Sequence, residues 1–360
     1  DADASVDAAA ADAAAPDAAP IPDAGPVTCP TAPTARPAGT LRSALPALVW
    51  WGAGYTIVLD QVVLEASFQL QLFLEQTDAT GARTAGPTPL TPAGTQALWP
   101  RIAYSGTEYG VTYLEGAGRA AAWVRADANL QPIAGSHVVV AASAGAVAVA
   151  WGHGQWAVVW SAPNTSGVQL QRFDAAGQRL GPPSTLGPGF ISDAGHPIVT
   201  TPRGFAVVAT DYGNGHVYEV DPQGTVRVVE LPFRTSRASI ATDGVELAVV
   251  AGERGCTYAR LPIGGAFDPT RFGSLGGSNC QVPSVIASGG QFLAIWSDTI
   301  NGSPAPLRLG ALPAGGAGGG APFSTQTNAG FSHAAAGSCG WAVVYQTFTP
   351  RTLSTLEVRP

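Results

Sequence analysis

Apolar and polar residues follow a pattern that returns seven times along the chain. Each copy begins with a short apolar stretch, passes through a glycine-containing turn, and resumes at a large apolar anchor followed by alternating small apolar residues. The copies lie at residues 47–59, 101–113, 147–160, 197–209, 239–251, 284–296 and 334–345. Their anchors, about 48 residues apart on average, are Tyr55, Tyr109, Trp156, Phe205, Leu247, Phe292 and Trp341. Alternation on both sides of a glycine turn predicts one β-hairpin per copy.

A third and a fourth strand are expected after each hairpin. The clearest example is VQLQRFDAAGQRLG at 168–181, in which a DAAG turn separates two short strands. Four antiparallel strands in a unit of about 45 residues are typical of a β-propeller blade. A β-helix has shorter coils, a sandwich does not repeat its sequence seven times, and an α-solenoid has a 3.6-residue period that this chain lacks. We therefore predict an all-β fold, a seven-bladed β-propeller of four-stranded antiparallel blades.

The two ends of the chain are predicted to meet in the last blade. Only TLSTLEVRP, residues 352–360, follows the seventh hairpin, which is enough for a third strand. A strand from within about residues 28–44 is therefore expected to complete this blade. Its addition would close the ring and protect the sheet edge.

The four cysteines fit this closure. In a meandering blade, the first-to-second and third-to-fourth turns share one face of the ring, while the second-to-third turns and the linkers between blades share the other. Cys29 and Cys339 fall on one face, and Cys256 and Cys280 fall on the other. Disulfides between these partners are predicted, which implies an oxidising compartment. Four buried thiols are the alternative, and a zinc site is less favoured because the chain has no CxxC motif.

Composition separates an N-terminal tail from the repeats. Residues 1–26 contain 12 Ala, four Pro and six Asp, with almost nothing large enough to bury. We therefore expect a disordered spacer at 1–27 and a single propeller domain at 28–360. The tail carries most of the formal charge of -7, so the propeller itself is nearly neutral, which argues against nucleic-acid binding. No apolar run of about 18 residues predicts a transmembrane segment.

Candidate binding residues come from comparing the repeats. Six residues after their anchors, where the second strand meets its turn, four copies carry a carboxylate: Glu115, Asp211, Glu253 and Asp298. A ring of such carboxylates would hold a cation or a basic partner, but we favour the alternative that each accepts backbone N–H bonds in its own turn. Trp51, Trp99 and Tyr212 do not follow the repeated core pattern and are candidate aromatic contacts for a sugar or a protein.

Signals for catalysis or metal binding are absent from the sequence. The five histidines have no repeated companion, and no GxSxG motif occurs. The stretch DYGNGH at 211–216 lacks the alternating acidic pattern of a calcium loop. We predict no catalytic residue, no metal site and no cofactor, and a structural cation such as Ca²⁺ has no motif to support it.

The hairpin followed by RFDAAG resembles the repeats of uncharacterised exported propeller proteins of high-GC Gram-negative bacteria, of surface or lipoprotein type. The resemblance covers about residues 28–360. It implies an extracytoplasmic protein that is secreted, periplasmic or anchored at the outer surface, with any lipid anchor upstream of the given chain. WD-repeat, kelch and sialidase-type SxDxGxTW motifs are missing, and the last absence lowers the expectation of an enzyme.

The function expected first is a non-catalytic extracytoplasmic binding or scaffold module with a protein or carbohydrate partner at one propeller face. The first alternative is a glycan-active enzyme or lectin with its site at the axial mouth. The second is a structural subunit of a surface assembly, because a nearly neutral surface associates readily.

Overall fold

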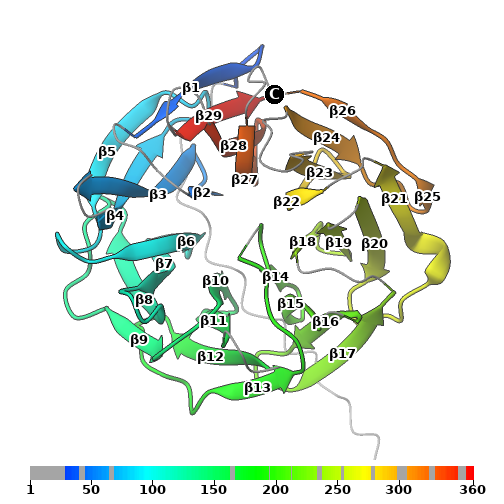
Figure 1. Ribbon diagram of the computed structural model, residues 1–360, viewed down its shortest axis with the longest axis horizontal. Coiled ribbons are helices and arrows are strands. Elements are labelled where there is room, and N and C mark those ends of the chain that lie inside the picture. The colour runs from blue at the N-terminus through cyan, green and yellow to red at the C-terminus, as the bar shows by residue number, and fades with distance from the viewer. Residues whose placement is uncertain are drawn as a thin grey trace, which may run out of the picture.

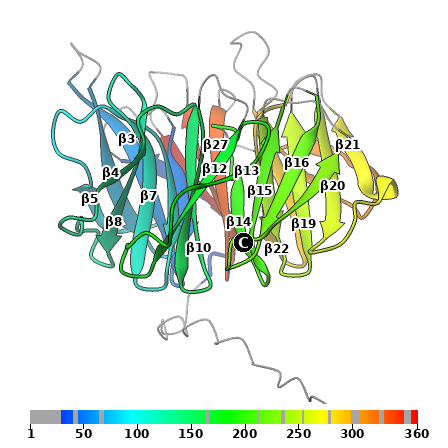
Figure 2. The same ribbon diagram turned by 90° about the horizontal axis from the view of Figure 1, so that it is seen from below.

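Seven β-sheets stand side by side around a central axis and form a ring (Figure 1). This computed structural model describes residues 29–39, 45–64, 69–162, 167–193, 195–211, 213–232, 237–252, 255–276, 280–297, 306–323, 329–347 and 354–360. Seen edge-on, the strands run between the two faces of the ring (Figure 2). The predicted seven-bladed all-β propeller is confirmed.

Each blade is an antiparallel meander whose first strand lies nearest the axis (Figure 1). Blades one to three consist of β2 (Ala47–Trp50), β3 (Tyr55–Leu64), β4 (Gln69–Thr77) and β5 (Arg83–Pro89); β6 (Ala97–Tyr104), β7 (Glu108–Glu115), β8 (Ala120–Asp127) and β9 (Val138–Ala141); and β10 (Ala146–Gly152), β11 (Gln155–Ser161), β12 (Val168–Asp174) and β13 (Ser184–Gly187). Blades four to six consist of β14 (Ile198–Thr201), β15 (Gly204–Thr210), β16 (Gly215–Val220) and β17 (Val226–Leu231); β18 (Arg237–Thr242), β19 (Glu246–Gly252), β20 (Cys256–Pro262) and β21 (Phe272–Gly276); and β22 (Gln281–Ser288), β23 (Gln291–Ser297), β24 (Leu307–Ala311) and β26 (Gly320–Pro322). Blade seven combines β27 (Ala329–Gly337), β28 (Gly340–Thr347) and β29 (Ser354–Arg359) with β1 (Thr34–Ala38).

The ring has two faces. The hairpin face carries the turns between first and second strands and between third and fourth strands. The linker face carries the turns between second and third strands and the connections from one blade to the next. A short 3₁₀ helix, η2 (Pro269–Arg271), precedes β21 in the connection between the third and fourth strands of blade five.

The second strand of a blade is nearly all apolar, and β11 shows why. It reads QWAVVWS and is buried at every position, because neighbouring blades cover both of its sides. In its turn, Gly154 has a φ of +69°, which glycine adopts without strain, and Trp151 lies opposite Trp156. Trp123 of blade two packs on Trp156 and on Phe173, with 4.4 Å between the Trp123 and Phe173 ring centroids. The repeated aromatic anchors are therefore core residues between blades.

The N-terminal strand closes the ring as predicted. β1 pairs antiparallel with β29, with Thr34 opposite Val358, so the last blade takes strands from both ends of the chain. Cys29 forms a disulfide with Cys339, and their Cα atoms lie 5.1 Å apart. Cys29 stands ahead of β1 rather than at its start, so the bridge holds the segment that leads into the closing strand.

A buried carboxylate ties the closing strand to blade one. Glu75 on β4 is buried and forms ion pairs with Arg36 of β1 at 2.7 Å and with Arg83 of β5 at 2.9 Å. A buried charge needs such partners, because its hydration is lost on folding. Blade seven and blade one are thus joined by charge as well as by packing.

The second predicted disulfide is also present. Cys256 at the start of β20 is bonded to Cys280 in the linker before β22, with Cα atoms 5.0 Å apart, so both predicted pairings are confirmed. One arrangement was not predicted: β25 (Gly316–Ala317), from the sixth repeat, pairs parallel with β21 and adds a fifth strand to the sheet of blade five.

Aspartate begins the third-to-fourth-strand turn in successive blades. In blades one to four, Oδ1 of this residue accepts the backbone N–H of the residue four positions later; the aspartates are Asp78, Asp127, Asp174 and Asp221. Such bonds hold the turn in shape without help from other blades. The DAAG and related sequences are therefore turn formers at a fixed place in the repeat.

Arginine two residues before the turn aspartate connects one blade to the next. Arg125 donates from its two Nη atoms to the carbonyl oxygens of Ala175 and Ala176, at 3.0 and 2.7 Å, in the turn of blade three. Arg172 in turn reaches the third-to-fourth-strand turn of blade four and donates to the carbonyl oxygen of Gln223 at 2.9 Å. The RFDAAG sequence thus encodes a latch between successive blades.

The latch predicts the effect of substituting Arg172→Ala. We expect the free energy of unfolding, measured by urea denaturation, to fall by about 2 kcal/mol, because hydrogen bonds from a charged donor to carbonyls of blade four are lost. Arg179→Ala is the matched control, since this exposed side chain makes a single longer bond to the carbonyl oxygen of Val139 at 3.3 Å. Equal losses in the two variants would contradict the latch.

Residues 1–28 lie outside the described part of the chain, so the division into a spacer at 1–27 and a propeller at 28–360 stays a prediction. No helix in the described ranges is long and apolar enough to cross a membrane.

Candidate functional site

Side chains of the inner strands join neighbouring blades around the axis. Ser284 Oγ of β22 accepts the backbone N–H of Ala334 at 3.2 Å, and His333 Nδ1 of β27 accepts the N–H of Leu48 at 3.3 Å. Ser239 on β18 makes the equivalent bond to blade six. These side chains occupy equivalent positions in their repeats and join blades five, six, seven and one in succession beside the axis.

The segment leading into β14 reaches the centre of this ring (Figure 1). It is held there by Arg101, whose Nε donates to the carbonyl oxygen of Gly195 at 3.0 Å. His196 Nε2 donates to the carbonyl oxygen of Ala334 at 2.8 Å, and the His196 ring lies 3.7 Å from the ring of His333, centroid to centroid. Arg101 and His333 are buried, so side chains fill the axis at this level.

The ionisable groups of this axial cluster have shifted pKa values. Burial lowers the pKa of His196 to about 4 and holds the pKa of His333 well below its usual value, and in both cases the charge of Arg101 acts in the same direction. Burial also lowers the pKa of Arg101 to about 10, opposed by Asp193 and Asp60. At neutral pH the imidazoles are uncharged and Arg101 is protonated. The cluster is a packed structural centre, and two hollows with polar side chains in their walls lie between blades.

The larger hollow lies between blades one and two and has a volume of about 490 Å³. We call it the blade 1–2 groove; its lining residues are Pro89, Leu90, Thr91, Pro92, Thr95, Tyr113, Glu115, Val124, Pro132, Ile133, Gly135 and His137. Its walls come from the linker after β5, from β7 and β8, and from the segment before β9. Proline, leucine, isoleucine and valine side chains make most of the surface, with few polar groups.

Two polar side chains meet at this groove. Glu115 ends β7 at the linker face, and His137, just before β9, donates from Nε2 to a Glu115 carboxylate oxygen at 3.2 Å. Both side chains keep solvent access, with 28% and 46% of their surfaces exposed. Tyr113 lies beside them, its ring centroid 6.4 Å from that of His137. Burial, and then the Glu115 charge, raises the pKa of the Tyr113 hydroxyl, which stays protonated as a donor.

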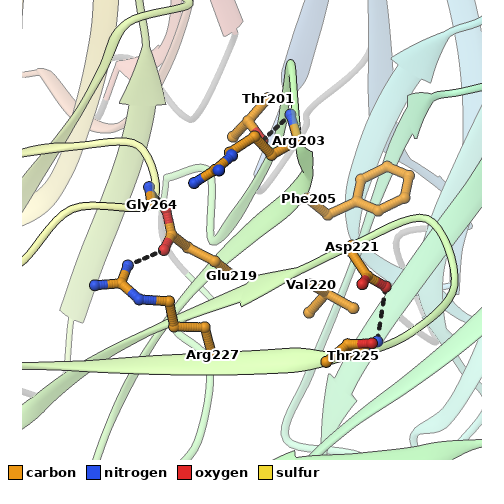
Figure 3. A pocket seen from close by; sticks show the side chains of 9 residues that line it. All are labelled: Thr201, Arg203, Phe205, Glu219, Val220, Asp221, Thr225, Arg227 and Gly264. Atoms are coloured by element: carbon orange, nitrogen blue, oxygen red, sulfur yellow. Dashed lines mark hydrogen bonds and ion pairs between the residues drawn. The ribbon is translucent and has the colours of Figure 1, made fainter. Parts of the chain in front are cut away.

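A second hollow of about 300 Å³ opens at the hairpin face between blades four and five (Figure 3). We call it the blade 4–5 cleft; its lining residues are Thr201, Arg203, Phe205, Glu219, Val220, Asp221, Thr225, Arg227 and Gly264. It differs from the groove in carrying two arginines and two carboxylates.

The predicted aromatic candidates lie apart from each other. Trp51 is in the first-to-second turn of blade one, on the hairpin face, where its Nε1 donates to the carbonyl oxygen of Thr77 at 3.3 Å. Trp99 lies in β6, has a φ of 54°, and stacks under the guanidinium of Arg119 at 4.1 Å. The structure does not bring these two tryptophans into one site, and Tyr212 lies outside the described residues.

Of the four predicted carboxylates, Glu115 and Asp211 are described, and Glu253 and Asp298 are not. Asp211 Oδ1 accepts the backbone N–H groups of Gly213 and Asn214, as in the turn-forming alternative. The Asn214 bond, followed by the bond from His216, lowers the pKa of Asp211 to about 2. Glu115 instead faces a groove.

His137 and Arg203 are candidate residues that the sequence did not single out. His137 sits in the loop between third and fourth strands, where the repeats differ in length and give no register. Arg203 has a detectable signal, because it is a cation at a turn position where the other copies have none. No group of three or more potential metal ligands occurs among the residues that the structure describes. The expected absence of a cofactor stays a prediction.

No protein-family model and no curated protein matches the chain. Solved structures do. The N10 neuraminidase-like protein of influenza A from the little yellow-shouldered bat is 12% identical, with a TM-score of 0.54, and the match covers 92% of this chain and 98% of that one. Trypanosoma rangeli sialidase in complex with sialic acid is 12% identical, with a TM-score of 0.51, over 92% of this chain and 57% of that chain. The Dos1 propeller is 10% identical, with a TM-score of 0.50, over 88% and 78% of the two chains.

The chain spans little more than half the length of the Trypanosoma rangeli sialidase. At such identities the likeness shows a shared propeller fold. The prediction that placed a non-catalytic binding or scaffold module first is contradicted, because several of the similar structures are sialidases or neuraminidase-like proteins. The likeness itself extends to the fold and assigns no activity to this chain.

Proposed function

We propose that the protein is a glycan-active propeller that takes up a neutral sugar in the blade 1–2 groove. The observation that carries the proposal is the Glu115–His137 pair, which faces a hollow whose remaining lining is mostly apolar. A hollow of 490 Å³ lies within the range of about 300 to 1,000 Å³ that small-molecule sites occupy. Sugar rings combine an apolar face with hydroxyl groups, which matches apolar walls around a few polar groups.

The negative charge of Glu115 determines which class of sugar the groove favours. Glu115 is the one carboxylate of the described lining, and His137 is its partner. A carboxylate accepts two sugar hydroxyls but repels an acidic sugar. Val124 and Ile133 offer apolar contact for an N-acetyl group. Neutral hexoses and N-acetylhexosamines therefore fit better than acidic sugars. Most glycosidases use two carboxylates, whereas the described lining of this groove has one, so binding of the saccharide and release of reducing sugar are both measured.

We also propose that the propeller works outside the cytoplasm as an exported protein of the bacterial surface or lipoprotein type, with residues 1–27 as a spacer. Its two disulfides support this, because they persist in oxidising compartments.

An array of neutral, N-acetylated and acidic saccharides, followed by calorimetric titration of the strongest binder, tests the glycan proposal. We expect a neutral or N-acetylated saccharide to bind. Glu115→Gln is expected to raise its Kd about tenfold or more, because a charged hydrogen-bond acceptor contributes about 1.5 to 3 kcal/mol. Release of reducing sugar from the same saccharide is measured in parallel and is expected to be lost with binding.

Glu230→Gln is the matched control, because Glu230 is an exposed carboxylate of β17 outside the groove. This variant should bind like the wild-type protein. The proposal fails if no neutral saccharide binds, if only acidic saccharides bind, or if both variants weaken binding equally.

A further inference from the structure

The blade 4–5 cleft lies where a carboxylate takes the place of the arginine that joins blades two, three and four. At the position where blades two and three carry Arg125 and Arg172, blade four carries Glu219. Glu219 accepts the backbone N–H of Gly264 from blade five at 2.7 Å and forms an ion pair with Arg227. Arg227 Nη2 in turn donates to the carbonyl oxygen of Gly265 in the same turn, at 2.7 Å. Glu219 and Arg227 therefore both take part in the contacts that join blades four and five.

Asp221 also has a structural role. Its Oδ1 accepts the backbone N–H groups of Gln223 and Thr225 at 2.9 and 2.8 Å, which forms the turn between β16 and β17. Figure 3 shows its carboxylate beside Thr225, away from the end of the cleft at Gly264.

Arg203 is the charged lining residue without such a role. Its backbone N–H is held by Thr201 Oγ1 at 3.2 Å, but among the described residues its guanidinium makes no hydrogen bond or ion pair. The blade fold does not require a cation here. Two residues before the anchor, the other six copies carry Ala53, Thr107, Gly154, Val245, Gly290 and Cys339.

The guanidinium of Arg203 is directed to one end of the cleft. Figure 3 shows Arg203 and Arg227 extending toward the same side, with Glu219 and Gly264 beside them. Gly264 has a φ of +74°, and a side chain on it would collide with the Arg203 guanidinium. Two guanidinium groups against one carboxylate leave this end with an excess positive charge. Phe205 and Val220 line the space toward Asp221.

We propose that the blade 4–5 cleft binds a small monocarboxylate through Arg203. The planar guanidinium fork matches a carboxylate in bidentate geometry. The body of the ligand lies in the space above Phe205 and Val220, which are almost completely buried beneath it. Asp221 at the far end disfavours a second negative charge. A volume of 300 Å³ admits a molecule the size of benzoate. This site is independent of the blade 1–2 groove, which lies between other blades.

The test is a ¹H–¹⁵N NMR titration of the full chain with sodium benzoate at constant ionic strength, following the Arg203 Nε–Hε and Gly264 N–H signals. We expect both signals to shift and saturate. Arg203→Gln should raise the Kd, read from the Gly264 signal, at least tenfold. The Kd of Arg203→Lys should lie between those of the wild type and Arg203→Gln, because lysine keeps the charge but loses the bidentate guanidinium geometry. Arg179→Gln, an exposed arginine outside the cleft, and Glu115→Gln should leave the Kd unchanged.

Inorganic phosphate and sodium chloride are the comparison anions. Weaker binding of phosphate than of benzoate supports the monocarboxylate. The proposal is overturned if benzoate shifts neither signal, if chloride gives the same response, if phosphate binds more tightly, or if Arg203→Gln and Arg179→Gln behave alike.

Discussion

Exchanging both Cys29 and Cys339 for serine is expected to lower the free energy of unfolding by about 6 kcal/mol, as the loop-entropy relation gives for a bridge of this span. The bridge spans 310 residues of sequence and so restricts almost the whole unfolded chain. The folded ring keeps β1 on β29 and the ion pairs of Glu75, so the variant is expected to fold. Thermal melting and urea denaturation under non-reducing conditions measure the loss.

The other disulfide provides the matched control. Cys256 and Cys280 are 24 residues apart, and the same relation gives about 3 kcal/mol for replacing both with serine. The closing bridge should therefore matter more than the local one. If the Cys29/Cys339 variant melts at or above the temperature of the Cys256/Cys280 variant, the ring does not depend on joining its two ends in this way.

Acidification from pH 7 to pH 5 is expected to destabilise the ring by about 2 kcal/mol through His196 alone. The folded-state pKa of His196 is lowered to about 4 from a usual value of 6.5, so between these values the unfolded chain binds a proton that the folded chain does not. Stability from this group is therefore complete above pH 6.5 and is lost as pH falls toward 4. His333, with its pKa lowered in the same direction, adds to the loss.

Urea denaturation at pH 7, 6 and 5 measures this dependence. Arg101 is the charged side chain that acts on both imidazoles, and it opposes their protonation. Asp193 and Asp60 act on Arg101, whose pKa they raise against the effect of its burial. His196→Gln combined with His333→Asn should flatten the profile over this range. A slope that survives in the double variant would mean that the axial cluster is not the acid-sensitive element.

The fold could be predicted because the sequence of each blade shows its hairpin pattern without information from the other blades. Strand alternation and turn glycines recur about every 48 residues, and the strand count left the last blade one strand short, which placed β1 and paired Cys29 with Cys339. Contacts that arise only when blades meet could not be predicted. The Arg172 latch, the axial segment at His196 and the parallel β25 depend on distances between blades, which no single repeat encodes.

The residues of the candidate sites also divide into those that the repeat pattern identifies and those that only the folded ring brings together. Glu115 was found from its repeat position, but its partner His137 lies in a loop of variable length, so the pair that defines the groove was not foreseen. Asp211 shared the repeat position of Glu115 and proved to be held by its own turn. Arg203 was visible as an exception to the repeat. Departures from repeat symmetry are therefore the better guide to chemistry in this chain.

Hydrogen–deuterium exchange of the full chain, with and without saturating amounts of the neutral saccharide that binds most tightly, tests the sugar site most directly. Bound sugar is expected to slow exchange in residues 89–95 and 130–137, which form opposite walls of the blade 1–2 groove. At a sugar concentration equal to the wild-type Kd, Glu115→Gln should remove most of this protection. Protection confined to the axial segment at 188–197 or to the blade 4–5 cleft, with residues 89–95 and 130–137 unchanged, would contradict the proposal.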